Sequence, residues 1–559
     1  MLSRYRGLIA IGLVLAAVGA WLSISDPIST SKSAAAPVAA AASDMATMRL
    51  PDGAVSWSSA EAAGTTGTYD WGDRCDQSTG QLAMSIDRPY ECFARFAGDN
   101  GGATATGITR DTIRVVAYET NDAGLTNLIN TRASSLSPTA GIDAQRGFAE
   151  ILGAYYETYG RRVEVVPFKA TGPSADGLAA VADAETIARE LSPFLVIGGP
   201  LLTNAFAERL ASLKVMCWNC APGQSNAWFV RQAPYVWDLQ KNPEQNGLMV
   251  NEYIGKRLMG KPAIYAGDPA LQTKQRVFGS LHITLGKDSE EIGDALRADQ
   301  ARYGFEYAVD AAFDDIGSVG KVGRDLITRL KDGGVTTIVY TGDPLSPGTF
   351  TKIATEQNYF PEWVITGTAL TDTAVLPRTY DQRQWAHAFG VANLFARPAS
   401  GRSTPVDMWR WFFGNDPPIP GAALSLSWAP YQVLFLGLQF MGPNATPEHF
   451  RDALFLAPAL EGNATTGQFS FGSRGFWPQP DYTGIDDQAE VWWDATAVGV
   501  DELGTSGTGM WRWMKGGARV LPGAWDAGDP ALFDPGTAVT MIDDSSAPAP
   551  KPYPPLRRS

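Results

Sequence analysis

The chain has 559 residues, a formal net charge of −14 and a pI near 4.8, with 45% hydrophobic and 19% charged residues. This composition can form a large core, which excludes a wholly disordered chain, a coiled coil and a collagen-like fibre. The acidic balance disfavours partners with a phosphate backbone, so we expect no nucleic acid binding. At roughly 100–200 residues per domain, the length predicts several domains.

The N-terminus has the pattern of an export signal. Arg4 and Arg6 precede an uncharged apolar run from Gly7 to Ile24, and such a run behind basic residues directs a chain across a membrane. The Ala-rich tract at 34–42 offers cleavage sites; the alternative is that the run stays as a membrane anchor. We therefore expect residues 1–44 to be a signal peptide or N-terminal anchor with a linker, and the body of the protein to be extracytoplasmic.

The four cysteines fit an oxidising compartment. Cys75 and Cys92 lie in a Gly- and Asp-rich stretch, and a disulfide between them would contribute about 3 kcal/mol on the chain-entropy estimate. Cys217 and Cys220 form a C-x-x-C pair at the end of a β-like run. A redox pair needs a helix N-terminus, and a zinc site needs two further ligands nearby. We therefore predict a second structural disulfide.

Two segments alternate β-rich runs with helical periods, and they predict two α/β lobes. In lobe 1, residues 106–240, apolar residues such as Phe148, Ile151 and Leu152 recur at helical spacing between the strands. Lobe 2, residues 241–425, repeats this rhythm. Strands separated by helices of about 10–15 residues predict parallel sheets covered on both faces, hence two Rossmann-like lobes with a ligand cleft between them. The expected strands are 112–118, 161–168, 194–199 and 215–220 in lobe 1, and 276–283, 307–313, 336–342 and 362–368 in lobe 2.

Four further segments flank the lobes. Residues 45–105 are predicted to form a disulfide-stapled N-terminal extension, and residues 426–460 two apolar helices that return to the lobes. Residues 461–541, with their alternating aromatic runs, predict an antiparallel β appendage. The Pro-rich end, 542–559, predicts a disordered tail.

Several motifs carry a family resemblance. They are GITRDTIRVVAY at Gly107–Tyr118, GIDAQRGFAEILGAYYETYGRRVEVV at 141–166, VIGGPLLTNAFAERLASLKVMCW at 196–218 and IVYTGDP at Ile338–Pro344. Together they resemble the type I periplasmic-binding fold, and within it the substrate-binding proteins of branched-chain amino-acid ABC transporters. The resemblance implies that a small ligand binds between the lobes, at the carboxyl ends of the strands. The crevices at those ends of open parallel sheets independently favour the same place.

The resemblance also implies ligand-binding residues, each with a structural alternative. Thr203 falls where the family has a ligand-binding Ser, with Asn204 beside it, but its hydroxyl can equally cap a helix. In lobe 2, Asp343 is the implied carboxylate or an ordinary turn residue. Tyr118 ends the first strand and is a ligand contact or a core ring. The loop after the fourth strand contributes Cys220 and Ala221.

No enzyme motif is legible in the chain. His282, His387 and His449 are far apart, and the patterns H-E-x-x-H, G-x-S-x-G, the Walker loop and G-x-G-x-x-G after a strand are missing. We therefore predict no catalytic residue, metal or cofactor. The predicted function is a monomeric extracytoplasmic protein that captures a small polar ligand, amino acid-like or amide-like, and delivers it to an ABC permease in the membrane. The alternatives are a ligand sensor for a membrane signalling partner and a secreted hydrolase.

Overall fold

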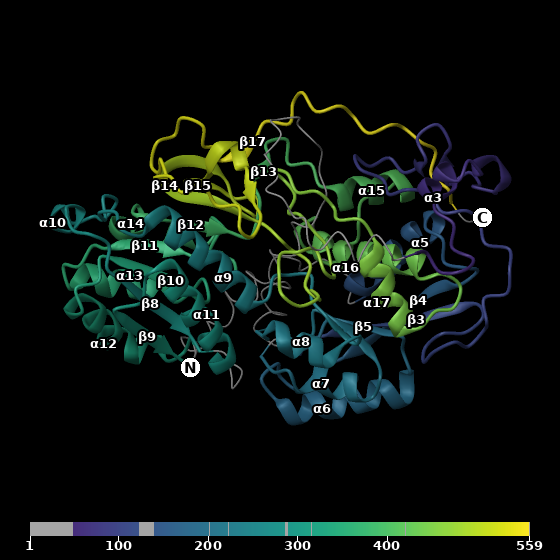
Figure 1. Cartoon of the computed structure of the whole chain (residues 1–559), viewed down its shortest axis with the longest axis horizontal. Coiled ribbons are helices and arrows are strands. Elements are labelled where there is room, and N and C mark those ends of the chain that lie inside the picture. The colour runs from purple at the N-terminus through teal and green to yellow at the C-terminus, as the bar shows by residue number, and fades with distance from the viewer. Residues whose placement is uncertain are drawn as a thin grey trace.

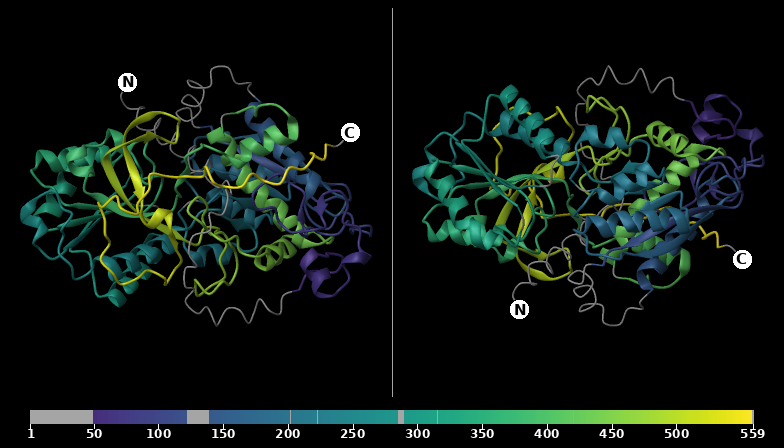
Figure 2. Two further views of the ribbon diagram at one scale, coloured as in Figure 1. Left: turned by 90° about the horizontal axis from the view of Figure 1, so that it is seen from above. Right: turned by 90° about the horizontal axis from the view of Figure 1, so that it is seen from below.

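The computed structural model describes residues 49–121, 139–200, 202–221, 223–284, 289–314, 316–419 and 421–557. The predicted leader, residues 1–44, lies outside the described residues. Figure 1 shows two α/β lobes side by side, and the two further views in Figure 2 show the same division. The predicted α/β class is confirmed, with parallel sheets flanked by helices in both lobes.

Lobe 1 is built on a five-stranded parallel sheet with the order β4-β3-β5-β6-β7. The middle of β3 is buried because Val115, Val116 and Ala117 lie between helices on both faces. The stripe on α5 predicted from its spacing, including Phe148 and Leu152, is buried against this sheet. The elements are β3 (Thr112–Glu119), α5 (Ala140–Tyr155), β4 (Arg162–Lys169), α6 (Gly177–Thr186), β5 (Leu195–Ile197), α7 (Ala205–Ser212), β6 (Met216–Trp218), α8 (Asn226–Gln232) and β7 (Val236–Trp237).

Lobe 2 repeats this topology with the parallel order β9-β8-β10-β11-β12. In both lobes the second strand of the chain lies outside the first, and the later strands add on the other side. The elements are α9 (Pro243–Tyr253), α10 (Pro269–Gln272), β8 (Phe278–Ile283), α11 (Ser289–Tyr303), β9 (Val309–Phe313), α12 (Val319–Asp332), β10 (Thr337–Thr341), α13 (Pro347–Glu356), β11 (Glu362–Ile365), α14 (Gln382–Trp385) and β12 (Ala388–Ala392).

The aromatic strands near the C-terminus extend lobe 2, which corrects the prediction of a separate appendage at 461–541. β14 (Gln488–Val500) pairs antiparallel with β12, so that Phe389 lies opposite Trp492. β15 (Ser506–Trp513) and β16 (Arg519–Val520) then pair with β14. Trp492 and Trp493 point to opposite faces of the sheet and are both buried. The aromatic run therefore forms an inner part of the lobe 2 sheet, with buried side chains on both of its faces.

Three helices that follow lobe 2 in the sequence pack on lobe 1. They are α15 (Thr404–Phe413), α16 (Gly421–Met441) and α17 (Pro447–Leu456). The Trp428 ring of α16 meets Phe148 of α5 at 5.0 Å between centroids, and Trp409 of α15 meets the same ring at 5.8 Å. The predicted boundary of lobe 2 at residue 425 is therefore wrong, because residues 404–413 already belong to lobe 1.

The N-terminal extension forms a small unit on lobe 1. It comprises α3 (Trp57–Ala62) and the short pair β1 (Cys75–Asp76) and β2 (Gln81–Leu82). The disulfide Cys75–Cys92 is present, as predicted. An ion pair between Arg74 and Glu157 joins this unit to lobe 1.

The C-terminal segment is placed on lobe 1, which corrects the prediction of a disordered tail. It leaves lobe 2 at β17 (Met541–Ile542), which pairs with β13 (Arg397–Pro398), and crosses to the far side of lobe 1 (Figure 2). The hydroxyl of Tyr553 donates to Asp76 at 2.6 Å, and the amide of Leu556 donates to the Tyr155 hydroxyl at 2.8 Å. Side-chain contacts therefore order a segment whose composition alone favours disorder.

The described chain passes between the lobes at four places. Crossing 1 is residues 238–242, crossing 2 is 393–403, crossing 3 is 457–487 and crossing 4 is 543–550. Crossing 1 follows β7 and crossing 2 follows β12, so each leaves the carboxyl end of a parallel strand. The carboxyl edges of both sheets therefore lie on the side where the chain joins the lobes.

Candidate functional site between the lobes

The candidate site is the set of loops at the carboxyl edges of the two parallel sheets, which we call the interlobe face. It comprises the described residues of the loops after β3, β5, β6 and β7 in lobe 1 and after β8, β10, β11 and β12 in lobe 2. The strand order reverses between β3 and β5 and between β8 and β10. Loops at such a reversal diverge to opposite faces of the sheet and leave a crevice, where open α/β sheets bind ligands.

The lobe 1 loops approach one another closely. A Cβ on Gly199 would lie 2.9 Å from the Cβ of Cys220, so only glycine fits beside the loop after β6. The predicted disulfide Cys217–Cys220 is present and closes that loop around Asn219, which adopts φ +53°. Cys220 and Ala221 are buried. A ligand role for these two residues stays a prediction.

Thr203 and Asn204 lie immediately before α7, as the resemblance implies. Thr203 Oγ1 accepts a hydrogen bond from the amide of Ala205 at 3.3 Å. Asn204 is the N-cap residue, and its side chain makes no capping hydrogen bond. The hydroxyl of Thr203 therefore has a local structural role, and its geometry at the start of a helix also suits contact with an anionic group.

Tyr118 is held by its own lobe. Its hydroxyl donates to Asp183 Oδ2 at 2.9 Å, and its ring lies 4.7 Å from Phe206 and 5.9 Å from Phe168 between centroids. Asp183 also accepts from the Thr171 hydroxyl at 2.6 Å. These contacts give Tyr118 the role of a packing ring with an internally bonded hydroxyl, which is the structural alternative to a ligand contact.

The Asp343 carboxylate is engaged in the turn that starts α13. Oδ1 accepts from the amides of Leu345 at 2.7 Å and Ser346 at 2.9 Å, and Oδ2 accepts from the Ser346 hydroxyl at 2.5 Å. Burial raises the pKa of Asp343 above its usual value, against the effect of these hydrogen bonds. The residue lies at the predicted edge of the sheet, but both of its carboxylate oxygens already accept hydrogen bonds within the local turn.

A polar network that the sequence analysis missed joins crossings 1, 2 and 3. Lys241 Nζ donates to the carbonyl of Asp487 at 3.0 Å and to Asn393 Oδ1 at 3.3 Å. Asn393 Nδ2 in turn donates to Asn246 Oδ1 at 2.8 Å, and Gln488 Nε2 donates to the same oxygen at 2.8 Å. Side-chain donors thus link crossings 1, 2 and 3, beside a backbone hydrogen bond from the Asp238 amide to the Tyr482 carbonyl at 3.1 Å.

Three acidic residues of the motif DYTGIDDQ at 481–488 accompany this network. Asp487 pairs with Arg519 at 2.8 Å. Asp481 Oδ1 accepts from Gln245 Nε2 at 2.8 Å, and burial raises the pKa of Asp481 to about 6. Burial and the neighbouring Asp481 raise the pKa of Asp486 well above its usual value. An acidic run inside an otherwise aromatic stretch is the signal that could have identified this site.

The lobes also touch directly across the interlobe face. Ser225, before α8 of lobe 1, donates to Glu291 Oε2 of α11 in lobe 2 at 3.2 Å. Arg231 of α8 lies 3.5 Å from the same carboxylate. Separation of the lobes would break both contacts. The interactions of Glu291 therefore depend on the relative position of the lobes.

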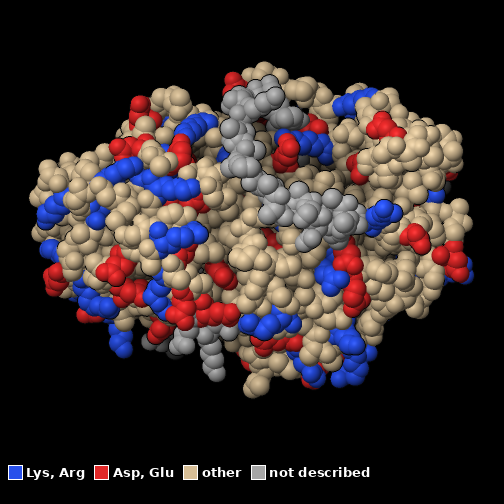
Figure 3. Space-filling view, in the orientation of Figure 1, with Lys and Arg blue, Asp and Glu red and all other residues tan. Residues whose placement is uncertain are grey.

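The surface and the ionisable residues limit the chemistry of the site. Acidic and basic side chains are interspersed on the face shown in Figure 3, and such mixing provides no field that attracts a polyanion. Within the described ranges, no group of three or more His, Cys, Asp or Glu side chains is arranged to hold a metal ion. In the same residues, no helix combines the length and apolarity needed to cross a membrane.

Solved structures provide the comparison with known proteins; no family model and no curated protein matches the chain. An ABC transporter substrate-binding protein from Sphaerobacter thermophilus aligns with a TM-score of 0.48 and 13% identity over 75% of this chain and all of that one. A solute-binding protein from Rhodopseudomonas palustris in complex with 4-hydroxybenzoate aligns with a TM-score of 0.47 and 13% identity, over 72% of this chain and 97% of that one. The branched-chain amino acid substrate-binding protein from Streptococcus pneumoniae in complex with isoleucine aligns with a TM-score of 0.42 and 13% identity, over 72% of this chain and all of that one.

These similar structures are binding proteins of ABC transporters. At such identities the similarity concerns the fold alone. The two matched sheets, their shared strand order and the crossings at their carboxyl edges are properties of this chain itself.

Proposed function

We propose that the protein is an extracytoplasmic solute-binding protein that holds a small polar ligand between its lobes and presents it to an ABC permease. The observation that carries this proposal is the pair of parallel sheets with the same order, joined by crossings at their carboxyl edges. Among the described residues, no strand pairs one parallel sheet with the other. Each lobe can therefore move as a unit, and a ligand that contacts both lobes favours their closure.

Export is supported by the apolar N-terminal run and by the two disulfides. Disulfides persist in oxidising compartments and are rare in the cytosol. The proposed ligand is amino acid-like or amide-like because the loop tips offer backbone groups, the Thr203 hydroxyl and the Asn204 amide. The protein is proposed to act as a monomer, since the ligand site needs both lobes of a single chain.

The test is a thermal-shift screen of the exported chain with amino acids, amides, polyamines, short peptides and hydroxybenzoates. A ligand that binds only the folded state raises the melting temperature by mass action. Small-angle scattering then measures whether the hit reduces the radius of gyration, as lobe closure requires. Binding without compaction, or no hit in the screen, would contradict the proposal.

Site variants connect a hit to the interlobe face. Thr203→Val should weaken binding about 5- to 150-fold, since an unmatched buried polar group costs about 1–3 kcal/mol. Ser212→Ala is the matched control, because Ser212 lies at the other end of α7 and its hydroxyl donates to the carbonyl of Arg209. Equal affinities of the two variants would remove Thr203 from the site. Uptake of the hit by membranes carrying the permease would separate transport from sensing.

A further inference from the structure

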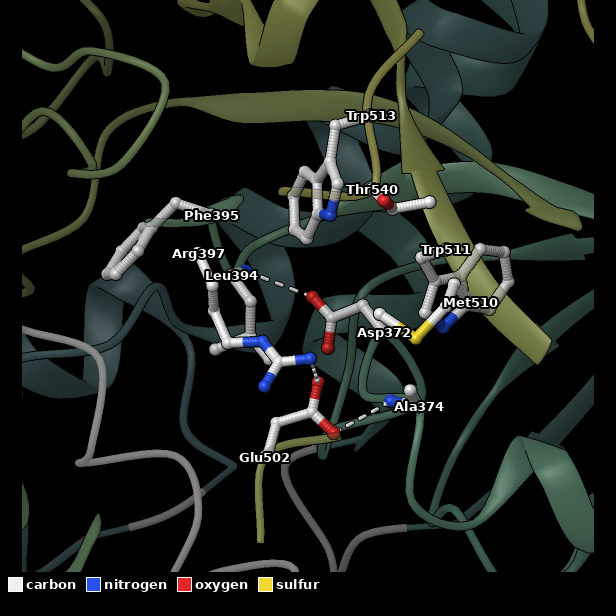
Figure 4. A pocket seen from close by; sticks show the side chains of 10 residues that line it. All are labelled: Asp372, Ala374, Leu394, Phe395, Arg397, Glu502, Met510, Trp511, Trp513 and Thr540. Atoms are coloured by element: carbon white, nitrogen blue, oxygen red, sulfur yellow. Dashed lines mark hydrogen bonds and ion pairs between the residues drawn. The ribbon is translucent and has the colours of Figure 1, made fainter. Parts of the chain in front are cut away.

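A small pocket lies at the side of lobe 2, between the loop after β11 and the strand β15. It opens to the surface, and its interior has room for about one water-sized molecule. Three side chains on β15, Met510, Trp511 and Trp513, form one wall, and Leu394 and Phe395 of crossing 2 form another. Figure 4 shows the carboxyl group of Asp372 among these residues, with Arg397 and Glu502 below it.

Asp372 carries an unmatched acceptor. It is 2% exposed, Oδ2 accepts from the amide of Leu394 at 2.9 Å, and Oδ1 is buried without a hydrogen-bond partner. In Figure 4 the second oxygen points away from Leu394, into the space beside Arg397 and Glu502. A buried acceptor without a partner is unfavourable, so a donor at this position would be stabilising.

The neighbouring charges leave the negative charge of Asp372 uncompensated. Arg397 lies 3.8 Å from Glu502, and it also donates to the carbonyls of Val500 and Asp501. Glu502 Oε2 accepts from the amide of Ala374 at 2.9 Å. Because the Arg397 charge is matched by Glu502, an ionised Asp372 gives the pocket a net charge of −1.

The pocket therefore combines a carboxylate with an indole wall. Aromatic faces attract cations, and a carboxylate accepts from N–H donors. A divalent ion would need about six oxygen ligands, and the side chains lining the pocket offer fewer. The small volume excludes a long amine.

We propose that this pocket binds a small ammonium group, either the ammonium ion or methylammonium, with the N–H donors on Asp372 Oδ1 and the cation against the aromatic wall. Nothing in the solute-binding function requires this site, and its residues come from lobe 2, crossing 2 and Thr540, which precedes β17. Leu394, Phe395 and Arg397 belong to crossing 2. An occupied pocket thus holds crossing 2 against lobe 2.

The experiment is a thermal melt of the exported chain at pH 8 in ammonium, methylammonium, tetramethylammonium, potassium and sodium chlorides at equal ionic strength. Burial raises the pKa of Asp372 to about 7, so the carboxyl group is ionised at this pH. Ammonium and methylammonium should raise the melting temperature by a few degrees over sodium at a concentration tenfold above the dissociation constant. Tetramethylammonium has no N–H donor and should match sodium.

Asp372→Asn should remove the difference between ammonium and sodium while it keeps an oxygen for the Leu394 amide. Asp494→Asn is the matched control: Asp494 lies on β14, and its carboxylate accepts from Thr496, Ala497 and Arg512. The control should keep the full response to ammonium, and circular dichroism verifies that both variants fold. An equal response to all the salts, or a response that survives in Asp372→Asn, would overturn the proposal. Line broadening of 15N-ammonium by the wild-type protein alone gives a second readout.

Discussion

A buried ion pair at the amino edge of the lobe 2 sheet allows a sharp test of how the two lobes contribute to stability. Arg276 Nε and Nη2 donate to the two oxygens of Glu362 at 2.8 and 2.9 Å, and the two side chains are 2% and 0% exposed. Glu362 also accepts from the Thr337 hydroxyl at 2.7 Å. The pair connects the starts of β10 and β11 to Arg276, two residues before β8, on the edge opposite the interlobe face.

Glu362→Gln removes the negative charge at nearly constant volume. The guanidinium of Arg276 is then left buried and uncompensated, for which a loss of about 3–5 kcal/mol is expected. In a cooperative unit of 150–250 residues, each kcal/mol shifts the melting temperature by about 2–4 °C. The transition of lobe 2 should therefore fall by about 6–20 °C in differential scanning calorimetry, with ligand affinity unchanged at 20 °C.

Glu356→Gln is the control, because Glu356 also pairs with an arginine of lobe 2. In that pair, Arg324 and Glu356 are 64% and 56% exposed, and exposed pairs contribute less than about 1 kcal/mol. Its melting temperature should stay within a few degrees of the wild type. Equal shifts in the two variants would refute the reasoning that burial decides the cost.

Three further predictions concern other parts of the chain. Asp343→Ala should destabilise the protein by about 1–2 kcal/mol in urea unfolding, because it breaks the turn before α13; unchanged stability would show that the turn does not need the carboxylate. Cys75→Ser with Cys92→Ser opens a loop of sequence separation 17, and about 3 kcal/mol of stability should be lost, seen as faster amide exchange in the N-terminal extension only; unchanged exchange would contradict this. The raised pKa of Asp486 means that the folded state holds a proton that the unfolded state loses above about pH 4. Stability should then fall as pH rises from there towards neutrality, and Asp486→Asn should flatten that slope; equal slopes would exclude Asp486 as the cause.

The α/β lobes could be predicted because their signal is local. The run Thr112–Glu119 is rich in β-branched residues and is followed by a helical period, and both patterns report burial directly. The two disulfides followed from compartment and spacing. The start of α7 after Thr203 followed from the family motif, and the structure places it there.

What could not be predicted depends on contacts between distant segments. Residues 488–513 read as an appendage because nothing local shows that Trp492 lies opposite Phe389 of β12. Tyr553 lies in a Pro-rich stretch, and its order comes from Asp76 at the other end of the chain. The network of Lys241, Asn246 and Asn393 consists of single polar residues whose proximity exists only in the folded protein.

The return of the C-terminus to lobe 1 sets a geometric bound on hinge motion. Crossing 4 is anchored at Ile542 by pairing with β13 and at Lys551 and Tyr553 by Asp76. At about 3.4 Å per residue, the segment between these anchors spans at most about 30 Å when fully stretched. It acts as a tether of fixed maximum length. The segment does not restrain the lobes until it is fully extended, and any larger separation first requires one of its anchoring contacts to break.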